Sequence, residues 1–297
     1  MTDSMAVAKG ATMERKKKES QFSLVIKRLA KNRLAMAGLC ITLLLFLLAL
    51  LSPVIMPYAY DELNMIDRFA KPSLRHLCGA DEMGRDIFSR LLYGARWSLA
   101  LGFLATIIST AIGMVIGSVV GYFGGTVDTV VMRFIDILQA IPGILLAIAI
   151  SACLGSGFAN TIIALSIGGI PMTVRLLRGS IMGVRKMEYL EAAQTINCSV
   201  PRLIVRHILP NSISPIIVSV TMGIGNTILM AASLSYIGLG VQPPTPEWGA
   251  MLSAGRTYMR DYPHMVLFPG IAIALVVLSL NMLGDGLRDA MDPTLKK

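Results

Sequence analysis

The chain has 297 residues, of which 54% are hydrophobic and 15% are charged, and its mean hydropathy is +0.66. A soluble domain carries about 25% charged residues, so the composition excludes a soluble protein and predicts one that spans a lipid bilayer. The formal net charge is +9 at pH 7, but no motif of a nucleic-acid-binding domain accompanies it, and we expect no nucleic-acid partner.

The N-terminal arm, residues 1–33, is polar and contains nine Lys and Arg residues. The apolar stretch 34–56 follows it and is long enough to cross a hydrocarbon core of about 30 Å. No small-residue cleavage site comes after this stretch, so we interpret it as the first transmembrane helix and not as a signal peptide.

Five further stretches have membrane-spanning length, namely 97–120, 130–154, 158–174, 213–234 and 265–283. The charge-free run 137–174 is too long for one helix at about 1.5 Å per residue, and we place a turn at Gly155-Ser156-Gly157. The sequence therefore predicts an all-α integral membrane protein with six transmembrane helices.

Three details of these spans lead to separate expectations. Arg133 and Asp136 lie one turn apart, a spacing suited to a mutual ion pair. Each of spans three to six is interrupted by a proline that is expected to kink or loosen the helix, namely Pro142, Pro171, Pro215 and Pro269. Residues 233–246 contain several prolines and glycines, which oppose a helix, so we expect this segment to lie at the membrane surface or to dip into it.

The orientation follows from the excess of Lys and Arg in cytoplasmic segments. Nine of these residues lie in the arm, six in 175–211, one at Arg133 and three in the tail, against six in 57–96 and two in 235–264. Both termini are therefore predicted to be cytoplasmic, with 57–96 as an extracytoplasmic loop and 287–297 as a cytoplasmic tail.

The extracytoplasmic loop contains Asp81, Glu82, Arg85 and Asp86. Clustered carboxylates suggest a metal or catalytic site, but no histidine has a spacing that would complete one. We favour exposed ion pairs that cap the following helix. No residue is expected to act as a catalyst, to ligate a metal or to bind a cofactor.

Gln242 and Trp248 lie in a second outer segment, and two interpretations of it stay open. The segment lines an entrance or contacts a binding protein, or it is a rigid interfacial loop anchored by Trp248. With the four loop residues, these two complete the set of candidates for an outer loop or gate.

The cytoplasmic segment 185–210 predicts a helical hairpin. Residues 185–196 are good helix formers, with Met187, Leu190 and Gln194 on one face. Asn197 tolerates the left-handed conformation that ends a helix. Ser199 is suited to cap a second helix that has Pro201 in its first turn and ends at Leu209-Pro210.

The segment Glu191-Ala192-Ala193-Gln-Thr-Ile-Asn197 resembles the EAA loop of the membrane-spanning subunits of ABC importers. In that family the loop is a coupling helix that docks in a groove on a separate ATPase, although the family usually has Gly at the position of Asn197. The resemblance assigns a coupling role to seven residues: Met187, Leu190, Glu191, Ala192, Ala193, Asn197 and Pro201.

Three other stretches, 78–96, 234–249 and 281–293, resemble permeases of the dipeptide, oligopeptide and nickel importers. The glycines and charges of the last stretch are expected to cap the final helix. The chain is thus similar to the second permease subunit, the C-type subunit, of that family in the bacterial cytoplasmic membrane. The family implies a type I ABC importer permease architecture, with a five-helix core over 97–286 that includes the coupling loop 185–210.

The resemblance also implies an assembly with a homologous second permease, two ATPase subunits and an extracytoplasmic substrate-binding protein. The chain has no G-x-x-x-x-G-K-[ST] loop to hold ATP phosphates, so it is not expected to be an enzyme, and ATP and Mg belong to the partner subunits.

The predicted activity is ATP-driven import of di- or oligopeptides, with nickel chelates or glutathione as alternative substrates. Two other classes, a secondary transporter and a passive channel, stay open. A secondary transporter would need ion-coupling residues at mid-membrane, and the spans show none.

Overall fold

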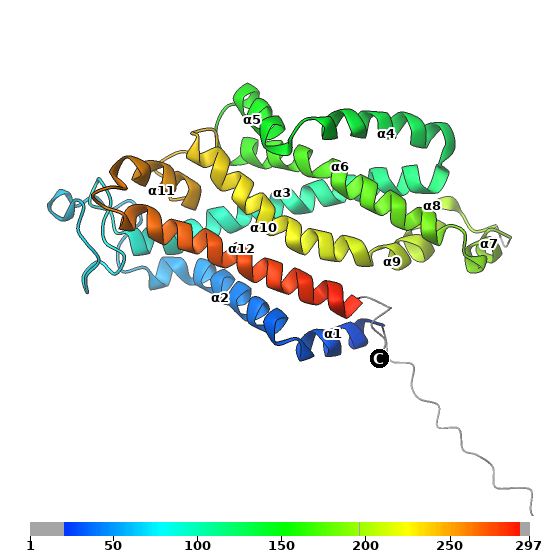
Figure 1. Cartoon of the computed structure of the whole chain (residues 1–297), viewed down its shortest axis with the longest axis horizontal. Helices are drawn as coiled ribbons and strands as arrows, with labels where there is room; N and C mark the ends of the chain where they lie inside the picture. Colours follow the sequence, from blue (N-terminus) through cyan, green and yellow to red (C-terminus); the bar gives the residue numbers. More distant parts are fainter. Residues whose placement is uncertain (1–20, 196, 292–297) are drawn as a thin grey trace, which may run out of the picture.

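The computed structural model describes residues 21–195 and 197–291, and the described residues are predominantly helical. Five helices are long and apolar enough to cross a membrane, namely α2 (Arg33–Ile55), α3 (Ile87–Phe123), α6 (Phe158–Val184), α10 (Ser214–Tyr236) and α12 (His264–Met291). They lie roughly along the long axis of the molecule (Figure 1). Each predicted span except the third corresponds to one of them, which confirms the all-α membrane architecture.

Shorter helices complete the fold: α1 (Gln21–Lys31), α4 (Gly125–Ala140), α5 (Gly143–Leu154), α7 (Glu188–Thr195), α8 (Val200–Leu203), α9 (Leu209–Ser212) and α11 (Trp248–Gly255). Two short 3-10 helices, η1 (Met65–Asp67) and η3 (Arg256–Tyr258), and a π-helical turn, η2 (Ile204–Ile208), lie between them. One end of the bundle carries α11 and the other carries α7, with α1 and the end of α12 on the α7 side (Figure 1).

The centre of the bundle is a close crossing of α3 and α6. Gly113, Gly117 and Gly121 recur every four residues on α3, and a Cβ at Gly117 would lie 3.1 Å from the Val174 carbonyl oxygen. Small residues at this spacing let two membrane helices approach until their backbones nearly touch. The α3–α6 pair is therefore held by short-range packing along one continuous stripe.

The first span is fixed to the last in the same way. A Cβ at Gly38 of α2 would lie 2.5 Å from the Ser279 carbonyl oxygen of α12. One turn further along, the Thr42 hydroxyl donates a hydrogen bond to the Ser279 hydroxyl, 3.1 Å away. The arm helix α1 adds a hydrogen bond from Arg28 to the Ala290 carbonyl oxygen, at 3.4 Å.

The predicted interruption of the third span at Pro142 is confirmed, but the prediction of a single helix over 130–154 is wrong. The chain forms α4 and α5 there, which are bent by 88° at a short break and count as one span only if taken together. Pro142 stands at the break, where it has no N–H to donate and disfavours helical geometry at Ile141 before it. Gly155 and Gly157 then turn the chain into α6, as predicted, both with positive φ.

Three further expectations need correction. Asp136 pairs with Arg175 of α6, at 2.6 Å, and not with Arg133. The second hairpin helix does not end at Leu209-Pro210, because the chain continues helically through η2 and α9. The last helix runs to Met291, so the glycines of its final third do not cap it.

One of those glycines permits another close contact. A Cβ at Gly286 would lie 2.1 Å from the Ala35 side chain of α2. Gly286 is therefore a packing position inside α12 and not part of a helix end.

The α2–α12 contact predicts that position 38 does not tolerate a large side chain. Replacing Gly38 with Leu should force α2 away from Ser279 and destabilise the protein by about 1–3 kcal/mol, the usual cost of overpacking. The measurement is the midpoint of thermal unfolding in detergent. Ala37→Leu, at the exposed neighbouring position, serves as the control and should leave the midpoint nearly unchanged; equal midpoints for both variants would contradict the assigned packing.

Candidate functional site

The hairpin formed by α7 and α8 lies at one end of the bundle (Figure 1). Its turn contains Asn197 in the left-handed region, with φ of 58°, which confirms the predicted conformation. Ser199 occupies the N-cap position of α8 with Pro201 in the first turn, but its side chain makes no capping hydrogen bond. The predicted helix–turn–helix therefore exists, with α7 running over Glu188–Thr195.

The two faces of α7 have different surroundings. Leu190, with 1% of its surface exposed, and Ala193 are buried and belong to a core cluster with Leu203, Ile208 and Ile181 of α6. These two predicted coupling residues therefore anchor the hairpin to its own chain and are not available to a partner. The other five predicted coupling residues, Met187, Glu191, Ala192, Asn197 and Pro201, are exposed.

The hairpin is mechanically continuous with two spans. α6 leads into α7, while α8, η2 and α9 lead into α10 with a break of one residue at Ile213. The Ser180 hydroxyl of α6 donates to the Ser212 carbonyl oxygen at the end of α9, at 3.0 Å. A displacement of the hairpin would therefore be transmitted to α6 and α10 together.

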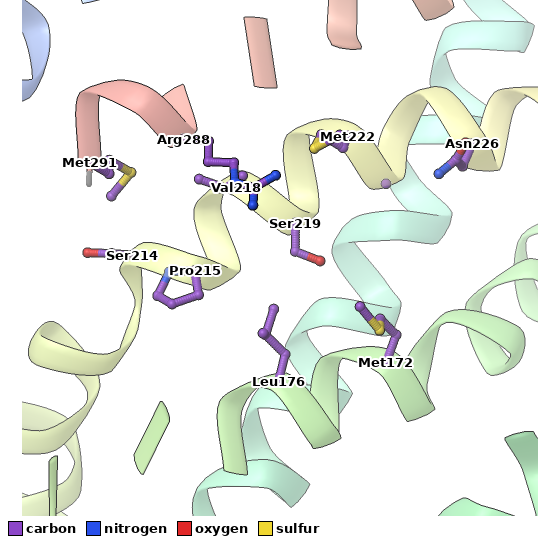
Figure 2. Close-up of a pocket in the computed structure, with 11 residues that line it drawn as sticks. Met172, Leu176, Ser214, Pro215, Val218, Ser219, Met222, Asn226, Arg288 and Met291 are labelled. Carbon is purple, nitrogen blue, oxygen red and sulfur yellow. The ribbon is translucent and has the colours of Figure 1, made fainter. Parts of the chain in front are cut away.

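A cavity of about 820 Å³ lies between α6, α10 and α12. Figure 2 shows Met172 and Leu176 on α6, Val218, Ser219 and Met222 on α10, and Arg288 near the end of α12 around it. Three methionines, with Leu176, Pro215 and Val218, make the lining mainly apolar, and long unbranched thioether side chains adapt to ligands of different shape.

The polar groups of the cavity come from α10 and α12. Ser214, Ser219 and Asn226 of α10 line it together with Arg288. Ser214 and Pro215 form the first turn of α10, so the cavity begins where the hairpin joins this helix. A neighbouring cavity of about 410 Å³ shares Met172, Leu176 and Pro215 with it and reaches Arg175.

These cavity residues were not predicted from the sequence. A signal was available in α10, where Pro215, Ser219, Met222 and Asn226 recur at intervals of three and four residues within an apolar helix. That spacing places them on one face. The Arg288 side chain joins this face only through the packing of α12 on α10.

At the opposite end, the charged cluster of the outer loop is mostly buried. Arg85 pairs with Asp81 at 2.7 Å and with Glu82 at 3.2 Å, which confirms local ion pairs. The expected exposure is wrong for all four residues, because Asp81, Arg85 and Asp86 are buried and Glu82 is only partly exposed. The three buried residues cannot contact a passing substrate and instead fix the loop.

His76 also contacts this cluster, although its spacing in the sequence did not indicate it. His76 Nδ1 lies 2.9 Å from Asp86 Oδ1, and His76 Nε2 lies 3.4 Å from Asp67 Oδ2. Asp86 also accepts a hydrogen bond from the Ser89 backbone N–H, at 2.7 Å, and thereby caps α3. Residues 21–195 and 197–291 contain no group of three or more His, Cys, Asp or Glu arranged to hold a metal.

Trp248 and Gln242 also have structural roles. Trp248 is 2% exposed, and its indole N–H donates to the Leu91 carbonyl oxygen of α3 at 3.0 Å, so it is not an interfacial anchor. Gln242 is exposed and donates to the carbonyl oxygens of Gly238 and Gly240. The segment after α10 is therefore a loop braced by its own side chains.

Glu247 attaches α11 to α3. Its carboxylate accepts from the Gly249 and Ala250 backbone N–H groups and from the Ser98 hydroxyl. Burial raises the pKa of Glu247, and the N–H donors act in the opposite direction. This residue was missed in the sequence, where a helix over Trp248–Gly255 was not expected.

The outer cluster predicts an unreactive cysteine. Burial, with a smaller contribution from Asp86, raises the pKa of the Cys78 thiol to about 11. At pH 8 only about one thiol in a thousand would be ionised, and the thiolate is the reactive form. N-ethylmaleimide at pH 8 should label Cys198, which is partly exposed, and leave Cys78 unmodified until the protein is unfolded in SDS. Similar labelling rates at both positions would contradict the burial of Cys78.

Comparisons with known proteins agree on one family. Residues 113–297 match the family described as binding-protein-dependent transport system inner membrane component, and residues 20–72 match the N-terminal TM domain of oligopeptide transport permease C. The match to the first family covers more than half of the chain.

Two curated relatives extend over nearly the whole chain. The dipeptide transport system permease protein DppC of Alkalihalophilus pseudofirmus is 46% identical over 284 residues, covering 94% of this chain and 93% of the relative. The glutathione transport system permease protein GsiD of Escherichia coli O6:K15:H31 is 48% identical over 276 residues, covering 91% and 89%.

Solved structures support the fold. The inward-facing MetNI methionine ABC transporter matches with a TM-score of 0.56 and 17% identity, over 68% of this chain and 96% of that chain. An amino acid ABC transporter matches with a TM-score of 0.52 and 16% identity.

Proposed function

This chain belongs to the family of binding-protein-dependent transport system inner membrane components, and we propose that it forms half of the translocation pathway of an ATP-driven importer of di- or oligopeptides. It is a multi-pass protein of the bacterial inner membrane, with five apolar spanning helices and a sixth span if α4 and α5 count as one. The observation that supports its role in coupling is the hairpin, which presents Glu191 and Ala192 outward and is continuous with α6 and α10.

The proposed assembly contains a homologous second permease, two ATPase subunits and an extracytoplasmic substrate-binding protein. The ATPases would bind ATP and Mg, and this chain would contribute no catalytic residue. Closure of the ATPases would push the hairpin, and the cavity between α6, α10 and α12 would change shape because two of its three walls move with the hairpin.

Glutathione is the second candidate substrate, because a relative named for glutathione transport is as similar to this chain as the one named for dipeptide transport. The cavity fits either class. Its adaptable methionines suit varied side chains, while Arg288 offers a positive charge to the carboxylates that both substrates have.

The decisive experiment is uptake into proteoliposomes that contain the complete complex and its binding protein. We expect accumulation of a labelled dipeptide that requires ATP and persists when ion gradients are dissipated. Glutathione in excess is the competitor that separates the two substrate classes. Uptake without ATP that follows an ion gradient would overturn the proposal in favour of a secondary transporter.

The hairpin generates a prediction about coupling. Glu191→Arg should lower substrate-stimulated ATPase activity at least several-fold, because the exposed carboxylate would no longer form a charge-assisted hydrogen bond with the ATPase. Folding should be intact, as judged by elution volume and thermal midpoint.

The control for Glu191→Arg is Asp61→Arg, an equal charge reversal at an exposed position of the outer loop. It should leave the ATPase rate of the detergent-solubilised complex close to that of the unmodified protein. Normal coupling in Glu191→Arg would refute the assigned role of the hairpin.

We further propose that both termini face the cytoplasm. The hairpin, α1 and the end of α12 lie at one end of the bundle (Figure 1), and the hairpin must meet ATPases there. A membrane-impermeant maleimide on intact spheroplasts should label Leu74→Cys, whose side chain is fully exposed in the outer loop. It should label Cys198 only after permeabilisation, and the reverse pattern would contradict this orientation.

A further inference from the structure

The outward face of α4 and its end carries a row of large apolar side chains that nothing in the described part of this chain covers. The row, here called the α4 seam, consists of Val127, Val130, Phe134, Ile137 and Ile141, each between 43% and 65% exposed. The intervals of three and four residues repeat as in the contact positions of a coiled coil. Such a row fits the side of another helix.

The opposite face of α4 is attached to α6. Of the residues of α4, all of them described, only Ile135 is buried. Asp128 forms a two-pronged ion pair with Arg178, and Asp136 pairs with Arg175. The helix is therefore held in place mainly by charged side chains, with its apolar seam turned away from the bundle.

The end of this helix lies beside the middle of α6, a helix long and apolar enough to cross the membrane. A Cβ at Gly168, near the middle of α6, would lie 3.9 Å from the Gly143 carbonyl oxygen just after the break. Ile141 and Pro142 at the break are exposed.

Lipid cannot cover this face. Non-helical backbone at membrane depth is tolerated only against protein or a water-filled cavity, and the break at Pro142 directly follows Ile141, the last residue of the α4 seam. α2 provides the contrast, because its exposed leucines belong to one continuous helix with no charge after Arg33. That surface can face lipid.

Water is an equally poor match for the α4 seam, because five large apolar side chains would be left hydrated. We propose that the α4 seam packs against a transmembrane helix of the second permease subunit, which also covers the α4–α5 break. The inference rests on the proposed function for the existence of that subunit, and it names the surface that meets it.

The test uses the complete complex, expressed from a variant in which the four cysteines are replaced. Phe134→Cys, Ile137→Cys and, as a control of similar exposure on α2, Leu47→Cys are each modified with a benzophenone maleimide and irradiated in native membranes. We expect adducts with the second permease at positions 134 and 137, and adducts with lipid at position 47.

Two readouts separate the possible failures. Co-purification of the second permease with this chain is measured in the same preparations, and its absence would overturn the proposed function together with the inference. If the subunit co-purifies but positions 134 and 137 react only with lipid, or are labelled by a water-soluble maleimide as fast as Leu74→Cys, the inference alone fails.

Discussion

A peptide group in hydrocarbon needs a hydrogen-bond partner, and the architecture of this protein follows from that requirement. Long uninterrupted helices satisfy it within each segment, and they make up α2, α3, α6, α10 and α12. Irregular backbone is concentrated at the two ends of the bundle, in the outer loop and in the hairpin (Figure 1). The break between α4 and α5 is the exception, and its position next to the middle of α6 therefore points to a covering partner.

The helices are joined by contacts that differ in kind between regions. Glycines of α3 and α2 let helix backbones approach closely, so these helix contacts are held by steric fit. α4 is joined to α6 by ion pairs instead. Glycine contacts tolerate little displacement, because any shift creates overlap or a void, whereas long arginine side chains can follow a neighbouring helix as it moves. The fold thus combines a stiff α3–α6 pair with a more loosely attached α4.

The two ends of the molecule are also built differently. At the outer end, buried ion pairs and the His76–Asp86 contact attach the loop to α3, and Glu247 and Trp248 attach α11 to the same helix. At the hairpin end, only one face of α7 is anchored, by Leu190 and Ala193. Glu191 and Ala192, on the other face of α7, are exposed, and the hairpin is continuous with two walls of the cavity, which is the arrangement that a lever requires.

The sequence by itself determined the membrane class, the five long helices, the hairpin with its left-handed Asn197 and the family, because each depends on local composition, spacing or short motifs. It did not determine which charges pair, how sharply the third stretch bends at Pro142 or which residues line the cavity. Asp136 meets Arg175, and Arg288 joins Ser219 in the lining of one cavity, only after helices distant in the chain pack together. The charged residues of the outer loop were predicted to be exposed because a local sequence pattern does not report burial. Only the tertiary structure showed that other parts of the protein cover them.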